Sequence, residues 1–129
     1  MARPTSPVLT DAELRLMKVL WERGKGTVSE IVEALPRRSR LAYSSVLTTL
    51  RILENKGYLR HEKQGRAFIY VPLVGRGEAR RQSVQHLVDR FFDRSPGSLA
   101  LNILENEDLD EEDLRKLRGL IEKAGQTDD

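Results

Sequence analysis

Hydrophobic residues recur at three- and four-residue spacing in most segments of the chain, whereas the stretch after Gly57 changes to an alternating pattern. The periodic segments predict helices over residues 11–23, 28–35, 42–56, 77–94, 98–106 and 111–124. The alternating stretch predicts strands over residues 58–63 and 67–71, joined by a turn at residues 64–66. The chain is therefore expected to be mainly α with a small β-hairpin.

Polar residues mark where these helices begin and end. Thr10 is followed by Glu13, and Thr27 by Glu30, which is the spacing of a capping box. Gly57 supplies the left-handed residue that ends the third helix. The inward stripe of the first helix is expected to consist of Leu14, Met17, Leu20 and Trp21.

The helix over residues 42–56 has an outer face unlike that of an ordinary surface helix. Its apolar residues fall in one sector, and the opposite side carries short hydroxyl and amide groups with a guanidinium. Such a face offers small hydrogen-bonding groups to base edges in a DNA major groove, without bulk or negative charge. A solvated helix that is merely rich in Ser and Thr is the alternative. The residues expected to read bases are Tyr43, Ser44, Ser45, Thr48 and Arg51.

Basic side chains lie on both sides of that helix. Arg38 and Arg40 occupy the turn before it, and Lys63 and Arg66 flank the tip of the predicted hairpin, where they are expected to contact the DNA backbone. The order helix, helix, basic turn, helix and hairpin is that of a winged helix-turn-helix. Residues 8–74 are therefore predicted to form a DNA-binding domain of this type.

Residues 75–124 are predicted to form a helical dimerisation domain. Helices with this much apolar surface cannot bury it alone, and helix-turn-helix proteins commonly bind two half-sites as dimers. Internal packing of these helices is the alternative. The residues expected at the interface of a homodimer are Val84, Leu87, Val88, Phe91, Phe92, Leu99, Leu101, Leu104, Leu117 and Ile121.

Charge and composition narrow the functional classes. Residues 1–81 hold 16 Lys and Arg against 8 Asp and Glu, whereas residues 82–129 hold 6 against 12. The amino-terminal part is therefore basic, which is typical of a segment that binds a polyanion. The chain has no cysteine, which removes thiolate metal sites and cysteine nucleophiles. His61 and His86 have no recognisable metal or nucleophile partner, so no enzyme activity, metal or cofactor is predicted. No apolar run approaches the roughly 18 residues of a membrane span, so no membrane insertion is expected.

Several motifs in sequence order resemble the penicillinase-repressor (BlaI/MecI/CopY) family. They lie at residues 9–13, 19–21, 27–31, 42–50, 57–59, 68–70 and 98–99, within a resemblance that covers residues 8–124. The resemblance implies a cytoplasmic bacterial repressor that binds a palindromic double-stranded DNA operator as a homodimer. A winged-helix module that binds protein and not DNA is the alternative function.

The resemblance also implies a mode of inactivation. A membrane sensor-protease responding to a cell-wall or β-lactam signal would lead to cleavage in the dimerisation domain, which matches Asn102-Ile103 here. At the cut, staphylococcal relatives have Phe where this chain has Ile103. They also carry a basic residue in place of Leu47 in the third helix, so their operator sequence is not expected to carry over. The copper-responsive branch uses cysteines near the carboxy terminus, and copper sensing is therefore not expected.

Overall fold

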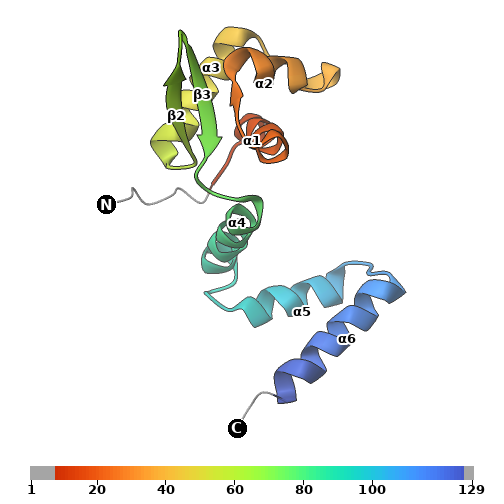
Figure 1. The fold of residues 1–129 in the computed structure, drawn as a ribbon. Helices are drawn as coiled ribbons and strands as arrows, with labels where there is room; N and C mark the ends of the chain where they lie inside the picture. Colours follow the sequence, from red (N-terminus) through yellow and green to blue (C-terminus); the bar gives the residue numbers. More distant parts are fainter. Residues whose placement is uncertain (1–7, 127–129) are drawn as a thin grey trace. The chain divides into compact units, whose positions relative to one another are not determined.

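The computed structural model describes residues 8–126 of the chain, and packing divides the chain into two compact units, one ending at His86 and one beginning at Leu87 (Figure 1). The elements are α1 (Asp11–Arg23), β1 (Gly26–Thr27), α2 (Val28–Ala34), the 3-10 helix η1 (Arg37–Ser39), α3 (Tyr43–Lys56), β2 (Leu59–Gln64), β3 (Ala67–Pro72), α4 (Arg76–Phe91), α5 (Pro96–Asn106) and α6 (Glu111–Gln126). The prediction of a mainly α chain with a small β-hairpin is confirmed.

Both predicted capping boxes are present. The Thr10 amide donates to Glu13 Oε1 (2.8 Å) and the Glu13 amide donates to Thr10 Oγ1 (3.1 Å), which fixes the start of α1. Thr27 and Glu30 make the same reciprocal pair at the start of α2, at 2.9 and 3.1 Å. The bond from the Thr27 amide is the main cause that lowers the pKa of Glu30. These side chains satisfy amides that the first turn of a helix leaves without partners.

The hairpin belongs to a three-stranded antiparallel sheet with the order β1-β3-β2. Gly65 (φ 62°) turns the chain between β2 and β3, whose register runs from Leu59 opposite Pro72 to Gln64 opposite Ala67. The sequence did not predict β1, because a strand of two residues shows no alternation. Through β1 the sheet is anchored directly before α2.

The core of the first unit lies among α1, α2, α3 and the sheet. The stripe predicted for α1 was half right: Met17 and Leu20 are fully buried, but Trp21 and Leu14 are only half-buried. Leu16 and Val19 take inner positions as well, because α1 is packed against α2, α3 and β3 and so buries a wider face than one stripe. The buried apolar side chains of this core are Leu16, Met17, Val19, Leu20, Val28, Ile31, Leu35, Val46, Leu50, Leu53, Tyr58, Leu59, Tyr70, Val74 and Ala79.

The start of α4 belongs to this first core. Val74 and Ala79 are both buried in it, and the Trp21 indole Nε1 donates to the Val74 carbonyl (2.8 Å). The division by packing therefore falls within α4, later than the 74/75 boundary expected from the sequence. The assignment of residues 75–124 to a separate domain stays a prediction.

The boundary between α4 and α5 differs from the sequence prediction. α4 ends at Phe91 and not at residue 94, because Asp93 (φ 49°) and Arg94 (φ 64°) take left-handed conformations. α5 begins at Pro96 and not at Ser98. Ser95 caps it by accepting from the Ser98 amide (3.1 Å), and Pro96 loses no hydrogen bond in the first turn.

The second unit contains α5 and α6, on either side of the turn at residues 107–110 (Figure 1). The Asp113 amide donates to Asp110 Oδ1 (2.7 Å), so the predicted cap of α6 is present. Neither helix has a buried residue within this chain. Within residues 8–126, no helix is long and apolar enough to span a membrane.

Candidate nucleic-acid interface

Helix α3 separates its buried and exposed sides as the sequence predicted. Val46, Leu50 and Leu53 are fully buried and hold the helix against the core. All five residues expected to read bases are exposed, and they are Tyr43, Ser44, Ser45, Thr48 and Arg51. The core therefore fixes the helix while its short polar side chains stay available to a partner.

A groove of about 260 Å³ lies where α3 meets the hairpin and the start of α2. Tyr43 and Arg51 line it from α3, and Arg66 and Phe68 line it from the hairpin. No acidic side chain is among its lining residues, so the groove brings together two guanidinium groups from segments far apart in the sequence. Guanidinium groups bind phosphate oxygens in a bidentate manner, and the groove is thus suited to an anionic backbone.

The hairpin is tied to the end of α3 by an ionisable pair that the sequence analysis missed. His61 Nδ1 on β2 lies 2.9 and 2.8 Å from the two carboxylate oxygens of Glu54 on α3. The His61 ring also lies 4.7 Å from the Phe68 ring and 5.8 Å from the Tyr70 ring, centroid to centroid. Burial, and then the Glu54 carboxylate, raise the pKa of the Tyr70 hydroxyl. These contacts hold the hairpin at a set position relative to α3.

All four residues predicted to contact the DNA backbone are exposed. Arg38 lies in η1, while Lys63 and Arg66 flank the turn of the hairpin. Arg40 has a further role, because its Nη2 donates to the carbonyls of Glu33 (3.2 Å) and Leu35 (3.1 Å) and so caps the end of α2. The phosphate contacts of all four residues stay predictions.

The predicted dimerisation residues are not equally available to a partner. Most are exposed: Val84, Leu87, Phe91, Leu101, Leu104 and Ile121. Phe92, Leu99 and Leu117 are half-buried. Val88 is the exception, since only 2% of its surface is exposed and it packs inside this chain. Its place in an interface is therefore not supported by the structure.

The proposed cleavage position lies in the middle of α5. Asn102 and Ile103 are both exposed, and the Asn102 carbonyl accepts from Asn106 Nδ2 (3.0 Å). The helix around this peptide bond has to unwind before a protease can hold the bond in an extended form.

Among residues 8–126, no group of three or more His, Cys, Asp or Glu is placed to hold a metal ion.

A family model described as "Penicillinase repressor" matches residues 9–123, nearly the whole chain. The chain belongs to the penicillinase-repressor family. This confirms the resemblance seen in the sequence motifs. Because the family consists of DNA-binding transcriptional repressors, the prediction that the chain is not an enzyme is confirmed as well.

Individual relatives match this chain over most of its length and most of their own. The penicillinase repressor of Bacillus licheniformis is 32% identical over 117 residues, which are 91% of this chain and 91% of that protein. The methicillin resistance regulatory protein MecI of Staphylococcus aureus is 23% identical over 115 residues, which are 89% of this chain and 94% of that protein.

Among solved structures, the DNA-binding domain of the repressor BlaI is similar to part of this chain. The likeness has a TM-score of 0.52 and 33% sequence identity, and it covers 59% of this chain and 93% of that domain. The fold is thus that of a winged-helix DNA-binding domain, as the sequence predicted.

Proposed function

We propose that the protein is a transcriptional repressor that binds operator DNA sequence-specifically as a homodimer. The observation that carries the proposal is the exposed polar side of α3 beside the groove that holds Arg51 and Arg66. Family membership supports it, and so do a relative named as a penicillinase repressor and a solved domain described as DNA-binding.

Recognition would combine two kinds of contact. Ser44, Ser45, Thr48 and Arg51 would bond to base edges in the major groove, with Tyr43 at the start of the helix. Basic side chains before α3 and on the hairpin would neutralise phosphates and set the orientation of the helix, and these are Arg38, Arg40, Lys63 and Arg66. Because the hairpin is tied to α3 through His61 and Glu54, both kinds of contact would be presented together.

Dimerisation is supported by the second unit. α5 and α6 have no buried residue in this chain, although Leu101, Leu104 and Ile121 are large apolar side chains. Helices that bury so little apolar surface are marginal in water, so these two need a partner surface. A second copy related by two-fold symmetry would cover them and would place two α3 helices on a palindromic operator. Occupation of the operator would then block transcription sterically.

Inactivation would follow from cleavage between Asn102 and Ile103. We expect a membrane sensor-protease responding to a cell-wall or β-lactam signal to trigger this cut, with the repressor in the cytoplasm. The absence of buried side chains in α5 supports the step, because little packing within the chain opposes local unwinding. The cut would separate α6 from the DNA-binding unit. The two half-site contacts would then lose the effective concentration that the dimer provides.

The test is fluorescence anisotropy of the whole chain on its own promoter DNA and on a scrambled duplex, each at two salt concentrations. A repressor should prefer the promoter strongly and should lose affinity for both duplexes as salt rises. Equal and weak binding to both duplexes would overturn the proposal and favour a winged helix that binds protein.

A further inference from the structure

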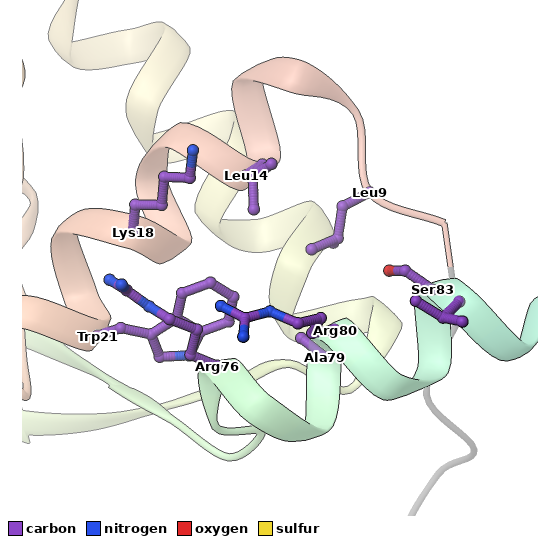
Figure 2. A pocket seen from close by; sticks show the side chains of 9 residues that line it. Leu9, Leu14, Lys18, Trp21, Arg76, Ala79, Arg80 and Ser83 are labelled. Atoms are coloured by element: carbon purple, nitrogen blue, oxygen red, sulfur yellow. The ribbon is translucent and has the colours of Figure 1, made fainter. Parts of the chain in front are cut away.

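The first unit contains a second hollow, between α1 and the first turns of α4, with a volume of about 330 Å³ (Figure 2). Its wall is apolar: Leu9, Leu14 and Trp21 contribute from α1 and the residues before it, and Ala79 and Val84 contribute from α4. The volume lies at the small end of the roughly 300–1,000 Å³ typical of ligand pockets. The hollow is thus large enough for a single-ring molecule. Val84 was assigned to the dimer interface from the sequence, but here it lines this hollow.

The same hollow is bordered by positive charge. Lys18, Arg76 and Arg80 line it, and no lining residue is acidic. Within residues 8–126, none of these three side chains forms an ion pair with Asp or Glu. The Arg76 guanidinium carbon lies 5.6 Å from the centre of the Trp21 ring, and Figure 2 shows Arg76 and Arg80 reaching toward that ring. Like charges gathered beside an apolar wall favour an occupant that is itself anionic.

We propose that this hollow binds a small aromatic carboxylate. The ring would pack on Trp21 and the apolar wall, and the carboxylate would accept hydrogen bonds from the guanidinium of Arg80 or Arg76. A nucleic-acid phosphate would satisfy the cations but would leave the apolar wall without a partner. The proposal does not rest on DNA binding, because none of the lining residues belongs to the surface of α3 or the hairpin.

Trp21 allows a direct test, because the chain has a single tryptophan. The indole N–H resonance and the intrinsic fluorescence therefore both report from this hollow. The whole chain is titrated with phenylacetate and, separately, with the uncharged phenylacetamide, and calorimetry gives each Kd. We expect saturable binding of phenylacetate that shifts the indole signals. The Kd of the amide should be at least about tenfold higher than that of phenylacetate, because the amide lacks the charge that pairs with the cations.

Matched variants show whether the rim cations are responsible. Arg80→Gln removes a cation of the hollow, whereas Arg81→Gln removes an exposed cation from the adjacent position of α4, outside the hollow. Arg80→Gln should weaken phenylacetate binding about tenfold and leave phenylacetamide unchanged, while Arg81→Gln should alter neither. Both positions are exposed, so equal thermal midpoints are expected and would show that folding is intact.

Four results would overturn the proposal. Phenylacetate could leave the indole resonance unmoved at saturating concentration, or the acid and the amide could bind equally. Arg81→Gln could weaken binding as much as Arg80→Gln, or inorganic phosphate could displace phenylacetate at a similar concentration, which would leave only a basic patch. An indole resonance that moves with protein concentration but not with phenylacetate would show that a second copy of the chain occupies the hollow.

Discussion

Short side chains give the exposed surface of α3 its character, and Arg51 reaches furthest from it. Arg51 also lines the groove that contains Arg66, so it lies between the helix and the wing. A guanidinium at this position can make a bidentate contact with a guanine edge or contact a phosphate. Substitution of Arg51 distinguishes the two roles, because loss of a base contact lowers sequence discrimination whereas loss of a phosphate contact weakens binding to all DNA alike.

Arg51→Ala should reduce discrimination between operator and scrambled DNA by about 1–3 kcal/mol, the value of one bidentate base contact. Lys63→Ala is the control, because its exposed ammonium at the hairpin is expected to contact only backbone and so should weaken both duplexes alike. Anisotropy titrations of both variants on both duplexes measure the difference. Unchanged discrimination in Arg51→Ala would show that the reading face is assigned wrongly.

Glu13 is a buried carboxylate with two roles. Only 4% of its surface is exposed, and its Oε1 accepts from both the Thr10 amide and Lys56 Nζ, each at 2.8 Å. The Lys56 ammonium also donates to the Val8 carbonyl (3.1 Å). The end of α3 is thereby fastened to the start of α1.

Lys56→Ala should lower the free energy of unfolding by about 1–3 kcal/mol, because it leaves the buried Glu13 carboxylate without its charged partner. Urea unfolding, monitored by Trp21 fluorescence, measures this change in the free energy of unfolding. Lys63→Ala, which removes an exposed lysine, should stay within about 0.5 kcal/mol of the wild type. A loss for Lys56→Ala no larger than that would show that the pair does not stabilise the fold.

At the scale of elements, the turn from α3 into the sheet decides where the wing lies. Gly57 has φ 93°, its amide bonds to the end of α3, and the Tyr58 amide donates to the Leu53 carbonyl (3.0 Å). An L side chain at this φ is strained. The His61 and Glu54 pair then holds β2 against the same helix.

Gly57→Ala should therefore destabilise the first unit by about 1–2 kcal/mol. Gly119→Ala is the opposite case, because Gly119 lies inside α6 and an added Cβ meets nothing within 4 Å. There the substitution should be neutral or stabilising by about 0.4–1 kcal/mol. Thermal unfolding followed by circular dichroism compares the two variants. Equal midpoints would contradict the role given to the turn.

At the scale of the whole molecule, operator affinity depends on whether two chains pair. Ile121 on α6 is 65% exposed in this chain and belongs to the apolar surface expected at the interface. An acid placed there would be costly to bury against a second copy.

Ile121→Asp should shift the protein from dimer to monomer in sedimentation equilibrium. Affinity for a half-site should be unchanged, while affinity for the palindromic operator should fall on the order of 10²-fold. Gln126→Asp adds the same charge at an exposed polar position of α6 and should alter neither property. A dimer that persists in Ile121→Asp would place the interface elsewhere.

Local and periodic features were predictable from the sequence. The capping boxes at Thr10 and Thr27, the stop at Gly57 and the two faces of α3 each depend on residues within one helix or its ends, so spacing alone reveals them. The order of elements followed from these features, and with it the winged helix. The exposure of the five α3 residues expected to read bases was predictable in the same way, because a polar helix face is a local pattern, while their contacts with bases stay a prediction.

Contacts between separate elements were decided only by the tertiary structure. The strand β1, the tie between Glu54 and His61, the cap that Arg40 places on α2 and the cationic hollow beside Trp21 each join residues whose separation carries no periodic signal. Packing on several sides of α1 likewise buried Leu16 and Val19, beyond the stripe that a helical period predicts. The spacing of apolar residues along the chain determines which face of an element is apolar. The three-dimensional arrangement determines which neighbours cover that face.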